Sequence, residues 1–356
     1  DEIRELTVFS ADQAPPQVSY SNDETIYTYP KLKAENGETY DVTYHLSIRE
    51  ENGELIFRST VENRCNIRVN EIQAPFLAFD HLNSAPEDEV LYIPNSLGER
   101  IENPRKWVRD TCHTEYMAAD YRNIWYSAVY PSPMAMAWMG VQSGGKFLCL
   151  FRKDEKFRIC AFCVGNSPRN TPSQLVLTVS QYPMAVQGET IETAPVTLAV
   201  YDDWRGASRD YRAWAESWYH PAPRPQWVQN MTGWQRIIMK HQYGEIFFRY
   251  EDLPKLYLDG KKAGLDTLLV FGWWKGRFDN NYPHYEADEA LGGAEGLKAA
   301  IAEVQRLGGR VLLYSNGKLI DVKTEFYREH GHDCCQIDID GNEYREHYQF
   351  SNNGTV

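Results

Sequence analysis

Side chains that could bind or react with a ligand follow three apolar segments in the C-terminal third of the 356-residue sequence. Each segment has the length of a buried strand and is succeeded at once by polar or aromatic residues. The carboxyl ends of parallel strands meet at one edge of a sheet, so these residues can converge on one site. They are Lys240 and His241 at the end of the first segment, Trp273, Trp274, Asp279 and Asn280 at the end of the second, and Tyr314 and Asn316 at the end of the third.

The residues after the second segment suit a carbohydrate ligand. The carboxylate of Asp279 can accept hydrogen bonds from two adjacent sugar hydroxyls, and charged acceptors form stronger hydrogen bonds than neutral ones. Asn280 can donate and accept beside it, while Trp273 and Trp274 offer apolar faces to the C–H face of a pyranose. The alternative is that residues 279–281 form a plain polar turn and that one tryptophan packs beneath the strands.

The other candidates are predicted to line the same pocket by the strand-end rule. For Tyr314 and Asn316 the alternative is a hydrogen bond at the strand end and a turn-forming asparagine; Lys240 and His241 rest on the strand-end rule alone. No residue is assigned as catalytic. No metal site and no cofactor are predicted, because the His and Cys residues of segment 330–335 match no closed zinc pattern.

The segments that position these residues alternate between strand and helix patterns. Expected strands are Trp234–Met239, Thr267–Phe271 and Val311–Tyr314, with helices at Tyr250–Ala263 and Gly292–Leu307 between them. This order predicts parallel strands with right-handed crossovers. An open nucleotide-binding sheet would carry a glycine-rich phosphate loop, and no such loop follows the first strand. We therefore predict that residues 230–356 form the N-terminal part of a (β/α) barrel, incomplete because a barrel takes about 250 residues.

Residues 1–202 have the pattern of an antiparallel β-sandwich. Asn52-Gly53 is a hairpin signal between two alternating segments. Many short strands with no helix between them predict two packed sheets. Residues 203–229 are predicted to be a helical linker, since aromatic residues recur at helical spacing before a proline-rich stretch. The strands expected are 40–49, 55–61, 66–72, 90–93, 125–130, 135–141, 146–151, 157–163, 174–181 and 195–201, and the linker helix is expected at 204–219.

The composition limits the partners. A formal net charge of −13 disfavours nucleic acid and anionic membranes as partners, and no segment has the ~20 apolar residues of a membrane span. Seven cysteines, an odd number, indicate reduced thiols and a cytoplasmic protein, although a secreted one stays open. Cys160 and Cys163 fall on an expected strand, where positions three apart face opposite sides, so they are not expected to share a metal.

The order of parts resembles bacterial glycoside hydrolases of the α-galactosidase and endo-α-N-acetylgalactosaminidase kind, and within that set an uncharacterised glycosidase-like family. The resemblance implies a multidomain β then α/β fold, in which an antiparallel β-supersandwich and a helical linker precede the first βα units of a TIM-type (β/α)8 barrel. It also implies that the nucleophile and the acid/base follow later barrel strands. The segments that carry it are Val61–Asn63 with Ile72–Phe76, Tyr201–Arg205 with Tyr211–Trp214, Phe271–Trp274 with Phe278–Pro283, and Gly296-Leu297 with Gly308–Tyr314.

Three functions are compatible with these patterns. The first, implied by the resemblance, is hydrolysis of O-glycosyl bonds, α-linked and with retention, in an oligosaccharide or glycoside substrate; retention uses two carboxylates about 5–5.5 Å apart. The second is a non-catalytic carbohydrate-binding protein. The third is a structural subunit whose incomplete barrel is an interface, completed by a second chain or a downstream segment, because strand edges are not left unpaired.

Overall fold

The computed structural model describes residues 4–21, 23–111, 124–166, 174–338, 341–347 and 354–355. The chain divides into two compact units, one covering Glu5–Pro221 and the other Ala222–Val356. We call them the β unit and the α/β unit and describe each by itself.

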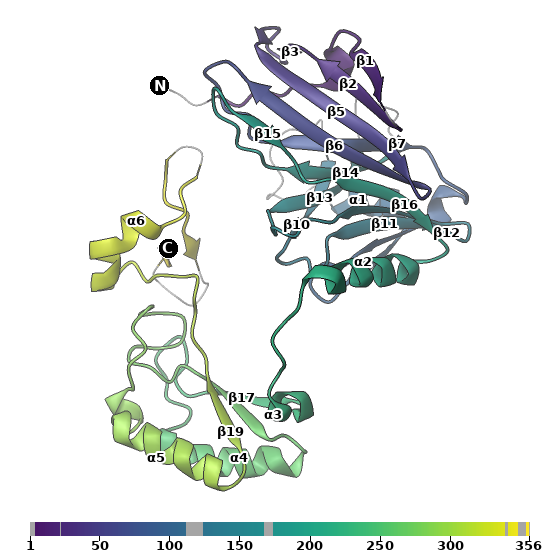
Figure 1. Cartoon of the computed structure of the whole chain (residues 1–356). Helices are drawn as coiled ribbons and strands as arrows, with labels where there is room; N and C mark the ends of the chain where they lie inside the picture. The colour runs from purple at the N-terminus through teal and green to yellow at the C-terminus, as the bar shows by residue number, and fades with distance from the viewer. Residues whose placement is uncertain are drawn as a thin grey trace. The chain divides into compact units, whose positions relative to one another are not determined.

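The larger sheet of the β unit contains ten strands in the described residues (Figure 1). Its order is β1-β2-β5-β6-β16-β12-β11-β8-β9, with β15 pairing on β6, and every described pair in it is antiparallel. The bounds are β1 Gln17–Ser21, β2 Glu24–Tyr29, β5 Val42–Glu51, β6 Glu54–Asn63, β8 Val90–Ile93, β9 Glu99–Glu102, β11 Trp138–Ser143, β12 Lys146–Arg152, β15 Thr190–Glu192 and β16 Val196–Tyr201.

A second sheet, in the order β10-β13-β14-β7, lies against the first through a shared apolar core. Phe147 and Leu150 from β12 and Phe162 and Leu177 from the second sheet are all in that core and fully buried. Burial of such side chains contributes about 1.5–3 kcal/mol each. The bounds are β7 Ile72–Phe79, β10 Ile124–Tyr130, β13 Cys160–Asn166 and β14 Leu175–Gln181; the short strands β3 Leu32–Lys33 and β4 Thr39–Tyr40 pair with each other.

Two expectations for the β unit are wrong. Segment 66–72 is not a strand, because it makes only an isolated bridge between Val69 and Ala185, and the strand begins where that segment ends, at Ile72. The proline inside β7 hides this strand from pattern analysis, since proline is uncommon within strands. A helix also interrupts the strands, α1 (Pro104–Thr111), which begins at a proline as helices often do.

The helix α2 (Trp204–Trp218) packs on the β unit. It begins at Asp203, whose side chain accepts hydrogen bonds from the backbone N–H groups of Arg205 and Gly206. Its buried residues Ala207 and Tyr211 belong to the sandwich core. The segment predicted as a linker helix therefore contributes to the sandwich core.

The α/β unit contains a parallel sheet of three described strands, β17 (Trp234–Ile238), β18 (Thr267–Phe271) and β19 (Arg310–Leu313). The strands are in register, with Ile237 beside Val270 and Val270 beside Leu313. The helices α4 (Leu253–Lys262) and α5 (Gly293–Arg306) connect them, in the strand–helix order that the sequence predicts (Figure 1).

One face of the parallel sheet is covered by the two helices. Ile237, Leu268 and Val270 from the strands share a buried core with helix residues, among them Leu297 and Val304. Side chains alternate along a strand, so the intervening residues belong to the opposite face. There Trp234 is half exposed and the guanidinium of Arg236 lies 4.5 Å from the ring centre of Phe271.

The remaining elements are short. None of the helices in the described ranges has the length and hydropathy that a bilayer crossing requires. The elements are α3 Gln226–Asn230, a π-helical turn Tyr327–Gly331, α6 His332–Cys334, the strands β20 Glu346–His347 and β21 Gly354–Thr355, and 3-10 turns at Ser10–Asp12, Pro86–Asp88, Tyr250–Asp252 and Glu289–Leu291.

The cysteines should differ sharply in reactivity. Burial raises the pKa of Cys160 to about 11 and also raises the pKa values of Cys149 and Cys163, whereas Cys334 is exposed. Because the thiolate reacts, iodoacetamide at neutral pH should modify Cys334 faster than these three by a factor on the order of a hundred or more. Peptide mass spectrometry measures this, with urea-unfolded protein as the control. Modification of Cys149 in the native protein at the rate of Cys334 would contradict the burial.

Candidate functional site

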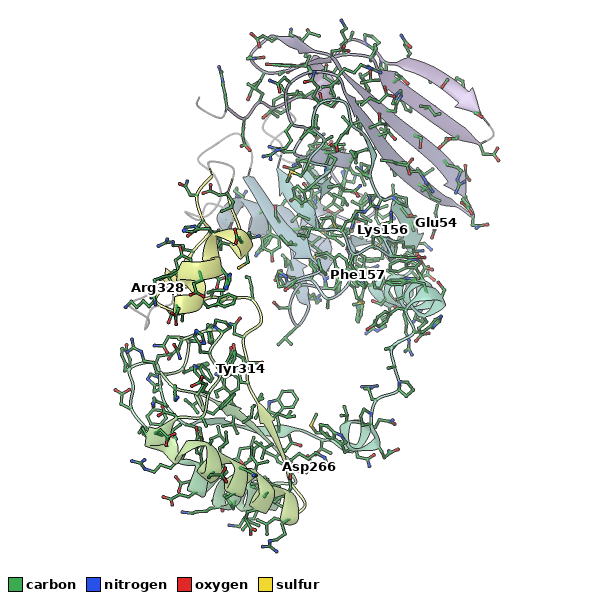
Figure 2. The ribbon with its side chains drawn as sticks, turned by 60° about the vertical axis from the view of Figure 1, so that its left-hand side comes forward. Glu54, Lys156, Phe157, Asp266, Tyr314 and Arg328 are labelled. Carbon is green, nitrogen blue, oxygen red and sulfur yellow. The ribbon has the colours of Figure 1, made fainter. Side chains whose placement is uncertain are left out.

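The carboxyl ends of β17, β18 and β19 bring three loops together. The loops cover residues 239–249, 272–288 and 314–325. Figure 2 shows Tyr314 at this end of the strands and Asp266 at the opposite, amino end. Gly272 begins the second loop with a φ of +60°, and any side chain there would collide with the backbone of Lys240. The first two loops therefore start in direct backbone contact, which glycine alone permits.

A buried ion pair joins the first loop to the end of the second. The ammonium of Lys240 donates to the carboxylate of Asp288, and both side chains are about nine-tenths buried. A buried charge is costly unless it is paired and hydrogen-bonded, and Asp288 also accepts from the backbone N–H of Ala290 at 2.9 Å. Lys240, predicted as a ligand contact, thus holds the two loops together in this structure.

Tyr250 lies beneath this pair and is fully buried. Its hydroxyl donates to the carbonyl of Trp273 at 2.5 Å and accepts from the backbone N–H of Asp288 at 2.8 Å. Burial raises the pKa of Tyr250 to about 12, so the hydroxyl keeps its proton at neutral pH. The hydroxyl of Tyr250 therefore provides a hydrogen-bond partner for a buried backbone group at each end of the second loop.

Asp279 lies in the middle of the second loop and is 9% exposed. Its carboxylate accepts from the side-chain amide of Gln242 at 2.5 Å and from the hydroxyl of Tyr282 at 3.2 Å. Burial, together with the nearby charge of Asp279, raises the pKa of Tyr282, which keeps this hydroxyl a donor. An ionised carboxylate has about four acceptor positions. Two are used here, so Asp279 keeps capacity for further donors such as sugar hydroxyls.

The side chain of Asn280 holds the loop. Its side-chain oxygen accepts from the backbone N–H of Arg277 at 2.9 Å, and the backbone carbonyl of Asn280 accepts from the indole N–H of Trp274 at 2.9 Å. Trp274 has no exposed surface and belongs to the apolar core of the unit. Asn280 thus makes the turn contacts of its alternative interpretation, and Trp274 is buried among aromatic residues of the strand-end loops, including Phe278, Tyr282 and Tyr285.

Trp273 and Tyr314 connect the second loop to the third. Trp273 is 8% exposed and its indole N–H donates to the carbonyl of Tyr314 at 2.9 Å. The Tyr314 ring stacks on Phe271, with ring centres 4.3 Å apart. Tyr314 keeps partial exposure at the strand end, where the sequence predicts a pocket-lining role.

The third loop is held by two further contacts. The backbone N–H of Asn281 donates to the carboxylate of Asp321 at 2.7 Å. The hydroxyl of Tyr285 donates to the carbonyl of Asn316 at 3.2 Å, and the Asn316 side chain accepts from the backbone N–H of Lys318 at 2.8 Å. Asn316 therefore forms the turn that its alternative interpretation described, and its remaining polar surface is partly exposed.

His241 lies in a short hairpin after β17. Its ring is between those of Tyr243 and Phe247, with centre distances of 5.4 Å and 5.5 Å, and its Nδ1 is 3.6 Å from the carboxylate of Glu245. His241 is partly exposed, unlike its neighbour Lys240.

Several residues that build this site are not among the predicted site residues. They share a position within the loops or at the start of the following helix, where periodicity gives no signal, although tyrosine and aspartate clusters in loops indicate hydrogen-bonding roles. These residues are Gln242, Tyr250, Tyr282, Tyr285, Asp288 and Asp321.

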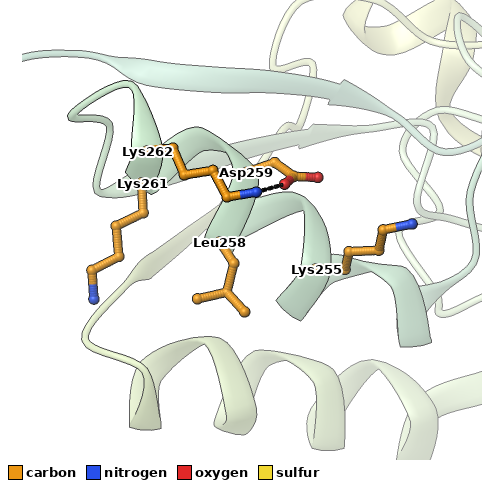
Figure 3. Close-up of a pocket in the computed structure, with 5 residues that line it drawn as sticks. All are labelled: Lys255, Leu258, Asp259, Lys261 and Lys262. Atoms are coloured by element: carbon orange, nitrogen blue, oxygen red, sulfur yellow. Dashed lines mark hydrogen bonds and ion pairs between the residues drawn. The ribbon is translucent and has the colours of Figure 1, made fainter.

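The arrangement is suited to binding a polar ligand. Asp279, Asp288 and Asp321 are buried carboxylates that already accept internal hydrogen bonds. Among the described residues no group of three or more His, Cys, Asp or Glu side chains could hold a metal ion. A surface hollow on α4 lined by Lys255, Leu258, Asp259, Lys261 and Lys262 (Figure 3) lies on the helix layer. Because α4 ends before β18 starts, its last residues are near the amino ends of the strands, opposite the three loops.

Comparisons with known proteins agree with the resemblance seen in the sequence. Residues 190–356 match the family described as a domain of unknown function, DUF6259. A protein of Bacteroides thetaiotaomicron named "Putative glycoside hydrolase" is 32% identical over 136 residues, which cover 38% of this chain and 18% of that protein.

Solved structures share the fold. An α-N-acetylgalactosaminidase from Bifidobacterium bifidum matches with a TM-score of 0.70 at 14% identity, over 98% of this chain and 58% of that one. An α-galactosidase from Geobacillus stearothermophilus matches with a TM-score of 0.50 at 12% identity, over 96% of this chain and 46% of that one. The chain thus resembles the glycoside hydrolase group, as the sequence indicates, and spans a fraction of the length of these relatives.

Removing the Tyr250 hydroxyl should destabilise the α/β unit. Tyr250→Phe leaves the N–H of Asp288 and the carbonyl of Trp273 buried without their partner, which should lower the free energy of unfolding by about 1–3 kcal/mol. Urea denaturation followed by circular dichroism measures this. Tyr344→Phe, at a half-exposed tyrosine of the same unit, is the matched control and should change it by less than about 0.5 kcal/mol. Equal effects of the two substitutions would refute the role of Tyr250.

Proposed function

We propose that this chain is part of a glycoside hydrolase that cleaves α-linked O-glycosyl bonds with retention of configuration. The observation that carries the proposal is the carboxylate of Asp279, fixed at the strand ends by Gln242 and Tyr282 with acceptor positions left for a ligand. The fold shared with an α-N-acetylgalactosaminidase and an α-galactosidase supports it. The substrate class that we infer is a terminal α-linked galactose or N-acetylgalactosamine residue.

In this proposal the three parallel strands are the first strands of a (β/α)8 barrel. The relatives are longer than this chain, and we infer that later strands, in further sequence of the complete enzyme or in a second chain, supply the two catalytic carboxylates. A nucleophile would attack the anomeric carbon and an acid would protonate the leaving oxygen, with about 5–5.5 Å between the two groups. Such a closed barrel would also pair the edges of β17 and β19.

The residues described here bind and orient the sugar. Asp279 accepts hydrogen bonds from two neighbouring hydroxyls, and Gln242 and Tyr282 fix its orientation. Tyr314, partly exposed at the end of β19, is a further contact in this proposal, and Trp273 holds it through the indole N–H. Trp274 is excluded from the contact set because it has no exposed surface. Fixing the non-reacting hydroxyls in this way lowers the barrier by orientation, since the anomeric carbon is held where the nucleophile can reach it.

A non-catalytic carbohydrate-binding protein is the second candidate. The observation in its favour is that the buried carboxylates of the three loops are all engaged in internal hydrogen bonds. A protein of this kind would bind the sugar through the same contacts as in the first proposal but would not hydrolyse it.

The direct test is hydrolysis by the complete polypeptide of the source organism. We expect release of 4-nitrophenol from 4-nitrophenyl α-D-N-acetylgalactosaminide or α-D-galactoside and none above background from the β-anomers. Proton NMR of the first product should show the α-anomer. Binding of the methyl α-glycosides without turnover would favour the second candidate, and a β-anomer as first product would exclude retention.

The Asp279 contact is tested by a substitution that preserves the loop. Asp279 has a φ of +63°, a conformation that asparagine also tolerates, so Asp279→Asn removes the charge with little strain. Loss of a charged acceptor for two hydroxyls should weaken binding of methyl α-D-N-acetylgalactosaminide or α-D-galactoside about tenfold to a hundredfold, as measured by calorimetry. Asp259→Asn, on the outer surface of α4, is the control and should bind as the unmodified protein does. Unchanged affinity in Asp279→Asn would remove this residue from the site.

A further inference from the structure

The hairpin after β17 carries exposed aromatic rings that the sugar contacts of Asp279 do not explain. The hairpin is ordered by main-chain hydrogen bonds, from the N–H of His241 to the carbonyl of Glu245 at 2.8 Å and from the N–H of Phe247 to the carbonyl of Met239 at 2.8 Å. Gly244 provides the turn with a φ of +99°, a value that favours glycine. The rings are therefore held on a defined backbone.

Two large rings of the hairpin face solvent. Tyr243 is 57% exposed and Phe247 is 53% exposed. Both lie beside the His241 ring, with ring centres 5.4 Å and 5.5 Å from it and interplanar angles of 36° and 33°, so the three rings form one cluster on the hairpin. We call His241, Tyr243 and Phe247 the aromatic platform. Grouped exposed aromatic surface of this kind marks binding sites more often than single exposed side chains do.

The platform is tied to the proposed sugar site through its own backbone. Gln242, between His241 and Tyr243, donates to Asp279, and Lys240, one residue before the platform, pairs with Asp288. The position of the rings is thus fixed relative to the carboxylate that is proposed to hold the terminal sugar. A ligand that extends beyond this sugar can meet the platform next.

The chemistry of the platform fits a neutral sugar ring. Its faces are apolar, while the phenol hydroxyl of Tyr243 and the carboxylate of Glu245, 3.6 Å from the His241 ring, lie at its border. A pyranose has the complementary arrangement, with C–H groups on its face and hydroxyls around its rim. The acidic chain, with a formal net charge of −13, disfavours an anionic ligand.

We propose that the aromatic platform binds, by stacking, the second pyranose of the substrate, next to the sugar held at Asp279. This inference rests on the proposed function. It adds a preference for a saccharide over a simple glycoside, because a methyl glycoside has no second ring to place on the platform.

The test compares two probes with the complete polypeptide. Calorimetry measures binding of methyl α-D-N-acetylgalactosaminide and of the disaccharide in which the same sugar is α1,3-linked to galactose. The double substitution Tyr243→Ala with Phe247→Ala should weaken disaccharide binding about tenfold and change methyl glycoside binding by less than about twofold. Tyr243→Phe retains the ring and should retain disaccharide affinity, which separates stacking from the hydroxyl. Leu258→Ala, at an exposed apolar residue of α4, is the control and should change neither value.

The outcomes separate the two proposals. One outcome is that the unmodified protein binds both probes while the double substitution weakens binding of the two equally or leaves both unchanged. In that case the platform does not bind the second pyranose, and the proposed function stands. If the unmodified protein binds neither probe, both are overturned. Sedimentation velocity of the same proteins supplies the last outcome: a dimer that dissociates on the double substitution would make the platform a contact between copies, which also overturns the inference.

Discussion

The ion pair between Lys240 and Asp288 is the contact on which the geometry of the strand-end loops depends. Its two members are 48 positions apart, one just after β17 and the other at the end of the loop that follows β18. Two charges cannot remain in an apolar interior unless they meet, and breaking such a pair is far more costly than never having formed it. The pair therefore joins the start of the first loop to the end of the second, and Tyr250 completes the arrangement by hydrogen bonding to both ends of the second loop.

The apolar core of the α/β unit provides the stable base on which the polar contacts position the loops. The helices α4 and α5 cover one face of β17, β18 and β19, so the strands are held by apolar burial, which is strong and non-directional. The loops add large side chains to the same core, among them Trp273, Trp274 and Tyr282, and their backbones are positioned by hydrogen bonds, which are weaker but directional. The sheet and helices thus form the scaffold, and the loops that they carry are ordered by burial and hydrogen bonding together.

The parallel strands and their helices are predicted well from the sequence, because burial against the core gives each of them a regular pattern of apolar residues. The Thr267–Phe271 strand is predicted with its observed bounds, since it is a continuous apolar run between polar ends. Periodicity does not show β7 and α1, for local reasons, a proline inside the strand and a helix that is too short; only the family resemblance includes the Ile72–Phe76 part of β7. The closure of the sheet into a barrel stays a prediction.

For the candidate site, the sequence indicates which strand ends matter but not what each side chain does. Lys240 and Asp279 were both found by position, yet one is neutralised by a partner 48 residues away and the other keeps free acceptor positions. Trp274 shows the same limit, because burial depends on Tyr282, Tyr285 and Phe278 packing around it. Pairings of this kind, within a loop or between distant segments, leave no regular spacing that a single sequence could reveal.

The left-handed backbone at Asp279 has an evolutionary consequence. With φ at +63°, and with Asn281 at +64° two residues later, the loop accepts few residue types at this position, chiefly glycine, asparagine and aspartate. Aspartate and asparagine have nearly the same shape and differ in charge. A single nucleotide change in a codon could therefore switch the site between an anionic and a neutral acceptor while the loop keeps its course. Selection on ligand preference could then act on charge alone, without first having to rebuild the fold around it.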